Sequence, residues 1–168
     1  MYEDIAKYVH SCEECQQRKQ IQFEESLHLT WSTTVCEKVG INIVYMPASI
    51  KGYGFIVFAR DDLSRWVEAR TLQKVDSLLV ATFIYKAIIY KHRLPQRIVL
   101  DGGSENLSLT KILLEHYRIK NIHISAYHPQ SNGLVERGHG PVVNALAKYA
   151  RDEHVNWPCY LSLALWAD

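Results

Sequence analysis

The alternation of hydrophobic and polar positions predicts a meander of three strands in the first half of the chain. β-Branched and apolar residues fill the first segment on both faces, which is typical of a strand in the centre of a sheet. Turn residues such as Gly52 and the Asp61–Asp62 pair separate the segments, and short turns favour antiparallel pairing. The expected strands are 39–46, 55–59 and 66–70.

In the second half, helical periodicity alternates with two short strands. Asp76 and Ser104 each precede a segment with apolar residues three and four positions apart, and both residue types cap helices. Strands are expected at 97–100 and 121–124, a long helix at 130–150, and a last amphipathic segment from Trp157. This order predicts an α/β fold with a mixed five-stranded sheet flanked by helices.

Composition narrows the class of protein. The chain has 168 residues, of which 48% are hydrophobic and 22% charged, so a folded domain is expected rather than a disordered tail. The net charge of +1 does not indicate a nucleic-acid binder, although a local basic face can bind without a large net charge. No apolar run approaches the roughly 20 residues that span a bilayer, and the start lacks a signal-peptide core. We expect an intracellular protein without a membrane segment.

The N-terminal part differs from the rest. We expect a small element at 1–25, a linker at 26–38 and the main domain at 39–168, which ends in the middle of a pattern. Cys12 and Cys15 have the spacing that lets two thiolates reach one zinc ion, but a closed site needs two further ligands. The alternative is a polar helix end with two unpaired thiols.

Two acidic residues are the strongest candidates for chemistry. Asp101 follows an expected strand, and Glu136 lies on the expected long helix, so their carboxylates can meet over a divalent cation. Asp101 can instead cap the turn at Gly102, and Glu136 can be a solvated carboxylate paired with Arg137 or His139.

The residues around these positions closely resemble the integrase core of gypsy-type LTR retrotransposons. Residues 125–139 read SAYHPQSNGLVERGH, and the segments 39–44, 61–66 and 98–105 match the family at its first strand, a turn and its second acidic position. The chain start at 8–16 is similar to the C-terminal half of the zinc-binding His-His-Cys-Cys domain that precedes such cores.

The resemblance implies a ribonuclease-H-like fold and a polynucleotidyl transferase that trims DNA 3′ ends and then joins them to target DNA. It assigns the catalytic positions to Asn42, Asp101 and Glu136, with Asp101 and Glu136 as ligands of two Mg²⁺ or Mn²⁺ ions. Asn42 stands where the family has its first aspartate, and an amide brings no charge. We expect weakened metal binding and largely lost catalysis, so whether the chain is an enzyme stays open. Zn²⁺ is expected only if the missing His half is supplied.

The resemblance also implies partners. These are element-end and target DNA, with RNA as an alternative, a homo-oligomer, and a location in the nucleus. The expected nucleic-acid contacts are Tyr127, His128, Gln130, Asn132, Arg137 and Lys148, and the densest basic cluster is Lys86, Lys91, His92, Arg93 and Arg97. A competing hypothesis is a catalytically dead nucleic-acid-binding or interaction domain that retains the fold. A ribonuclease H is a third, which the Tyr-His-Pro-Gln string disfavours.

Overall fold

The computed structural model describes residues 7–8, 11, 32–101, 108–124, 129–150 and 154–167, with only the backbone described at 101, 123–124, 129–138 and 154. The chain divides into two compact units, Met1–Trp31 and Ser32–Asp168. The division falls inside the expected linker, and every strand and helix below belongs to the second unit.

The second unit contains the mixed five-stranded sheet that the sequence predicts. Its strands are β1 (Lys38–Tyr45), β2 (Phe55–Asp61), β3 (Val67–Leu72), β4 (Arg97–Asp101) and β5 (Lys120–Ile124). The order across the sheet is β3-β2-β1-β4-β5. The meander β1-β2-β3 is antiparallel, whereas β4 runs parallel to β1 and β5 runs parallel to β4. The ribonuclease-H-like arrangement is thereby confirmed.

Helices follow the predicted order with one local difference. They are α3 (Ser77–Phe83), the π-helix η1 (Ile84–Ile89), α4 (Ser108–His116), α5 (Pro129–Tyr149), the 3₁₀-helix η3 (His154–Tyr160) and α6 (Leu161–Trp166). Asp76 caps α3 as expected, because its Oδ1 accepts a hydrogen bond from the Leu79 amide at 2.9 Å. The expected cap Ser104 lies outside the described residues. The one helix expected after Asp76 continues into a π-helical turn that 3.6-residue periodicity does not predict.

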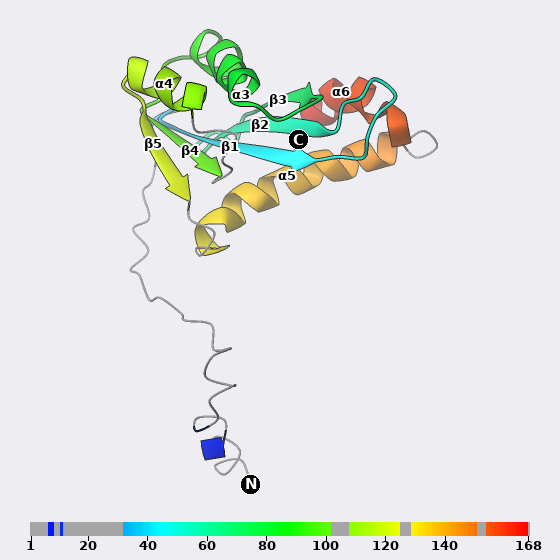
Figure 1. Ribbon diagram of the computed structural model, residues 1–168, viewed down its shortest axis with the longest axis horizontal. Coiled ribbons are helices and arrows are strands. Elements are labelled where there is room, and N and C mark those ends of the chain that lie inside the picture. The colour runs from blue at the N-terminus through cyan, green and yellow to red at the C-terminus, as the bar shows by residue number, and fades with distance from the viewer. Residues whose placement is uncertain are drawn as a thin grey trace. The chain divides into compact units, whose positions relative to one another are not determined.

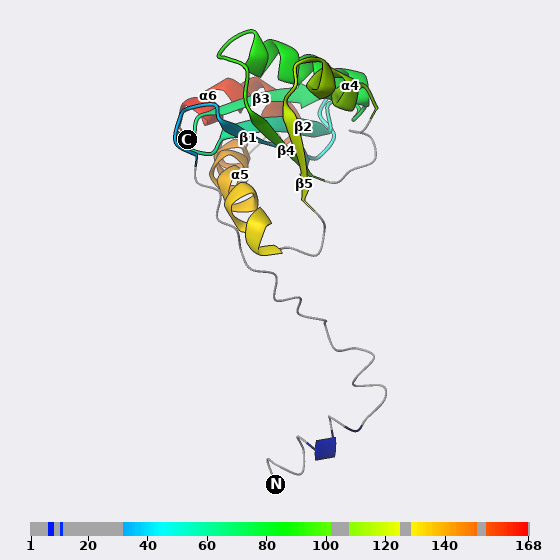
Figure 2. The ribbon, with the colours of Figure 1, turned by 90° about the vertical axis from the view of Figure 1, so that its left-hand side faces the viewer.

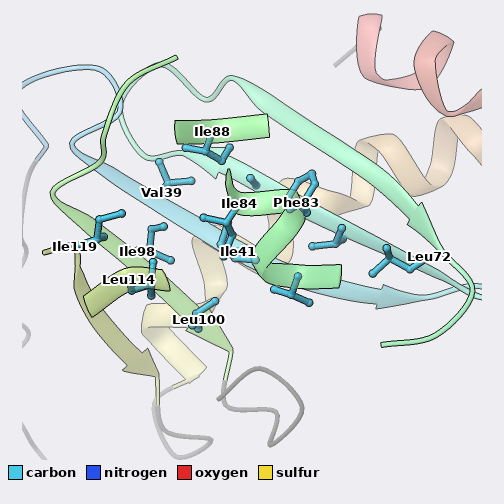
Figure 3. Close-up of a cluster of buried hydrophobic side chains, with 13 residues drawn as sticks. Val39, Ile41, Leu72, Phe83, Ile84, Ile88, Ile98, Leu100, Leu114 and Ile119 are labelled. Carbon is cyan, nitrogen blue, oxygen red and sulfur yellow. The ribbon is translucent and has the colours of Figure 1, made fainter. Parts of the chain in front are cut away.

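Two hydrophobic cores lie on opposite faces of the sheet. Because successive side chains of a strand alternate between faces, Val57 and Ala59 join one core while Ile56 and Phe58 join the other. The α3-side core is packed between the sheet and α3, η1 and α4 (Figure 3). The α5-side core is formed with α5, η3 and α6. Figures 1 and 2 show α3 and α4 on one face of the sheet and α5 on the other.

The C-terminal segment that begins at Trp157 contains both buried and exposed apolar residues. Trp157 and Leu161 are buried in the α5-side core, whereas Trp166 is 93% exposed. The Trp157 indole donates to the Pro47 carbonyl at 2.8 Å and so joins η3 to the loop after β1. No helix within the described ranges is both long enough and apolar enough to cross a membrane.

Candidate active site

The candidate site begins where β1 and β4 run side by side. Their parallel register pairs Ile41 with Leu100, so Asn42 and Asp101, the next residues on each strand, follow at the same level. Asp101 in turn pairs with Ile124 on β5. Asn42, in the middle of β1, and Asp101, the last residue of β4, thus bring two of the three predicted positions side by side in the sheet. The side chain of Asp101 lies outside the described part of the structure.

The third predicted position comes from α5. Val142 and Leu146 anchor this helix in the α5-side core, and the buried His139 ring lies 4.7 Å, centroid to centroid, from the ring of Phe58. Phe58 is the β2 residue that pairs with Asn42. Glu136 is three residues before His139, and such positions share one face of a helix. His139 thus lies on the face of α5 that is turned to the sheet, while the side chain of Glu136 is not described and its place at the site stays a prediction.

Asn42 lies on the same side of the sheet as α5. Ile41 and Ile43 pack into the α3-side core, so the position between them belongs to the opposite face. Val44, which shares that face with Asn42, packs against the α5-side core. The three predicted catalytic positions therefore come from β1, β4 and α5, with Asn42 half-buried between the elements.

The amide of Asn42 is held by its own strand. The Ile43 amide N–H donates to Asn42 Oδ1 at 2.8 Å. The register of β1 with β4 ends at Ile41, so Ile43 lies beyond that ladder, and the side chain accepts a backbone hydrogen bond there. A buried N–H without an acceptor costs about 1–3 kcal/mol, so the hydrogen bond from the part-buried Ile43 N–H stabilises the strand independently of any catalytic role of Asn42.

Asn42 is poorly suited to be a ligand of a two-ion centre. Divalent Mg²⁺ and Mn²⁺ prefer charged oxygen ligands, whereas the Asn42 oxygen is neutral and already accepts from Ile43, and its nitrogen cannot bind a cation. Among residues whose side chains are described, no group of three or more His, Cys, Asp or Glu is close enough to hold a metal ion. The side chains of Asp101 and Glu136 are not among these described residues.

Asp61 and Asp62 do not replace the missing carboxylate. Asp61 is buried and pairs with Val39 near the start of β1, and it accepts hydrogen bonds from the Cys36 amide at 2.8 Å and the Ser64 hydroxyl at 2.6 Å. Asp62 accepts from the Ser32 hydroxyl at 3.1 Å. Asp61 thus stabilises the turn after β2, and both carboxylates contact the segment that leads into β1 rather than Asn42.

The basic cluster is partly neutralised by carboxylates that the sequence analysis did not single out. Lys91 Nζ and His92 Nε2 lie 2.6 and 3.1 Å from Glu68 Oε1. Burial opposes ionisation of Glu68, but hydrogen bonds from Lys91, His92 and Trp66 outweigh it and lower the pKa of this carboxyl group. Glu68 alternates with apolar residues along β3, and this alternation predicts that it points away from the core. The pattern does not predict that Lys91 and His92 are its partners.

Arg97, the last member of the cluster, pairs with Glu37 at 2.8 Å. Lys86 and Arg93 are exposed. A DNA-facing role for the cluster stays a prediction, and its positive charge is smaller than the sequence suggests.

The remaining predicted contacts are largely outside the described residues. Tyr127, His128, Cys12 and Cys15 fall in undescribed segments, and Gln130, Asn132 and Arg137 are described only as backbone in α5. Lys148 is exposed near the end of α5. The nucleic-acid and zinc roles of these residues stay predictions.

Comparisons by sequence identify relatives among retroelement polyproteins, although no protein-family model matches the chain. The Retrovirus-related Pol polyprotein from transposon 412 of Drosophila melanogaster is 27% identical over 117 residues, 69% of this chain and 10% of the polyprotein. The Gag-Pol polyprotein of avian reticuloendotheliosis virus is 30% identical over 126 residues, 74% of this chain and 11% of that protein. The chain spans about a tenth of these relatives.

Solved structures similar to this chain include viral integrases. The catalytic core domain of BIV integrase is 25% identical with a TM-score of 0.64, covering 79% of this chain and 82% of that one. The HTLV-2 integrase catalytic core domain in complex with magnesium, in a dimeric form, has a TM-score of 0.64 at 23% identity, with 80% and 87% covered.

A longer match is the simian T-cell lymphotropic virus intasome in complex with PP2A regulatory subunit B56 gamma. Its TM-score is 0.73 at 24% identity, covering 99% of this chain and 60% of that one.

Proposed function

We propose that this chain is the DNA-binding core of an LTR-retroelement integrase with an impaired catalytic step, which its similarity to retroelement polyproteins and to integrase catalytic cores supports. The observation that carries the proposal is the shared level of Asn42 and Asp101 on adjacent parallel strands, with α5 packed on the same side of the sheet. This is the arrangement that the resemblance requires of its three catalytic positions.

The proposed substrate is DNA, and the proposed reaction is 3′-end processing followed by strand transfer in the nucleus. Both steps are displacements at phosphorus in which charge develops on oxygen. A set of carboxylates supports them by holding divalent cations, as the magnesium in the HTLV-2 core structure suggests. With Asn42 in that set, we expect the chain to keep the fold but to catalyse the reaction inefficiently. We also propose a homo-oligomer, since one neighbour is a dimeric form and another an intasome.

The decisive test compares this chain with its Asn42→Asp variant in strand-transfer and nuclease assays. We expect the variant to be faster by on the order of 10²-fold or more, because several kcal/mol of charge stabilisation in a transition state change a rate by that factor. Asn144→Asp adds the same charge at an exposed position of α5 and should leave the rate unchanged. Equal rates for the chain and Asn42→Asp would refute an impairment caused by position 42.

A second candidate is a non-catalytic nucleic-acid-binding or interaction domain. The hydrogen bond between Ile43 and Asn42 favours it, because the amide serves the backbone rather than a cation. Detectable DNA binding, without nicking by either the chain or Asn42→Asp, would support this second function over the first.

A further inference from the structure

We propose that Asn42 converts the cation site of this fold into a metal-independent contact for nucleic-acid phosphate, made by the amide NH₂ group. The proposal rests on the proposed DNA-binding function and deepens it. The Asn42 nitrogen contacts a phosphate oxygen of the DNA, and this contact does not need Mg²⁺.

The orientation of the amide follows from its partner. A backbone N–H can only donate, so the end of the Asn42 side chain 2.8 Å from the Ile43 nitrogen is its oxygen. The NH₂ group is the other end of the same planar unit, and it remains for contacts on the α5 side of the sheet. An aspartate in the same place has two oxygens, so one can accept from Ile43 while the second stays available for a cation.

An NH₂ group selects ligands of the opposite kind from a carboxylate. It carries two donors and no acceptor, so it repels metal cations and binds anionic oxygens. Phosphate oxygens are the commonest acceptors on DNA, and asparagine side chains are among the groups that contact them. Asn42 also removes one negative charge from a set that the family fills with three carboxylates. A phosphate group therefore meets less repulsion at this site when no cation is present.

The location of Asn42 suits such a contact. The side chain is half-buried rather than enclosed, and it stands at the level of Asp101, where the β1–β4 ladder ends. A single neutral hydrogen bond gives a modest gain in affinity, so the effect is measurable as a change in binding rather than as its complete loss.

The experiment measures binding of a fluorescent duplex oligonucleotide by anisotropy, in EDTA and in MgCl₂ at the same ionic strength. We expect the affinity of this chain to agree within about twofold between the two buffers. We expect Asn42→Asp to bind about tenfold more weakly in EDTA, because it loses a donor and gains a charge, and to recover in MgCl₂. Asn144→Asp, with its exposed added charge, should behave as the unaltered chain in both buffers.

A second measurement follows Mn²⁺ binding to the free proteins by calorimetry. Asn42→Asp should bind Mn²⁺ at concentrations at which the unaltered chain does not. Because aspartate keeps an acceptor for the Ile43 N–H, this variant should fold, and circular dichroism checks that it does.

The outcomes separate this inference from the function on which it rests. DNA binding by the unaltered chain that strengthens tenfold or more with Mg²⁺ overturns the inference and leaves a DNA-binding function standing. The same holds if Asn42→Asp binds DNA in EDTA as tightly as the chain does. No DNA binding by the chain in either buffer overturns both.

Discussion

Glu37 holds the entrance to β1 in place through contacts on both of its carboxylate oxygens. Oε2 accepts from the Thr33 amide at 2.8 Å, the Thr33 hydroxyl at 3.0 Å and the Thr34 amide at 3.3 Å, while Oε1 receives Arg97 at 2.8 Å. The hydrogen bonds from Thr33 are the main reason that the pKa of Glu37 is lowered. This carboxylate therefore links the segment before β1 to β4.

The lowered pKa of Glu37 predicts a pH dependence of stability. In the unfolded chain the carboxyl group has an ordinary pKa of about 4.3, so as the pH falls below that value protons bind the unfolded state first. The stabilisation by Glu37 is present above this pH and is lost as the pH falls through the lowered pKa of the folded state. We expect urea unfolding to give a larger drop in free energy between pH 6 and pH 3 for this chain than for Glu37→Gln.

Glu115→Gln is the control for that comparison. Its carboxylate is exposed and lies 3.8 Å from Lys111, so its removal should leave the drop nearly unchanged. A Glu37→Gln variant with the same pH dependence as the unaltered chain would contradict the assignment.

At the scale of elements, the start of α4 is capped from another helix. Ser77, the first residue of α3, accepts with its hydroxyl oxygen from the Leu109 amide at 2.7 Å and the Thr110 amide at 3.2 Å. The fully buried Thr110 returns a hydrogen bond from its hydroxyl to the Ser77 carbonyl at 3.3 Å. One side chain thus fixes the distance between two helices that cover the same face of the sheet.

Replacement of Ser77 by Ala should destabilise the fold by about 0.5–2 kcal/mol, the usual cost of a lost helix cap. Chemical denaturation would measure it, with Ser162→Ala as control because that serine is exposed within α6. A Ser77 variant as stable as the control would show that water replaces the cap without loss.

Element order was predictable because each strand and helix has a clear period, and β1, β2 and β4 were located to within one or two residues by apolar runs alone. The cross-helix cap was not predictable, since Ser77 and Thr110 are far apart in sequence and neither is unusual for its position. The π-helical turn at Ile84–Ile89 was also missed. Its apolar residues recur at nearly the spacing expected of an α-helix, so the sequence pattern does not distinguish the two kinds of helix.

The same distinction applies to the candidate site. The motif around Glu136 and the strand before Asp101 identify the positions, because strand ends and a helix face are readable from local pattern. The hydrogen bond from Ile43 that orients the Asn42 amide cannot be predicted from a local pattern. It depends on where β4 stops pairing with β1, which is set by the whole sheet.

At the scale of the whole molecule, one sheet separates two cores, and the C-terminal segment completes the second. Trp157 is 2% exposed, contacts this core and donates to Pro47. Trp166, nine residues later, is 93% exposed and contributes little to the described packing. These two tryptophans have the same chemistry in opposite environments.

We therefore expect Trp157→Ala to lower the free energy of unfolding by about 3–5 kcal/mol, the range for removal of a buried large aromatic side chain. Trp166→Ala should change it by less than about 0.5 kcal/mol, as surface substitutions usually do. Urea titrations followed by circular dichroism measure both. Equal effects of the two substitutions would mean that the α5-side core does not include η3.

The central position of β1 bears on how position 42 tolerates substitution. A strand flanked on both sides is among the last parts of a domain to open to solvent, so its geometry survives changes of single side chains. Under the proposed function, asparagine at position 42 therefore leaves the surrounding scaffold in place. Restoring a carboxylate there should recover activity without rebuilding the architecture around it.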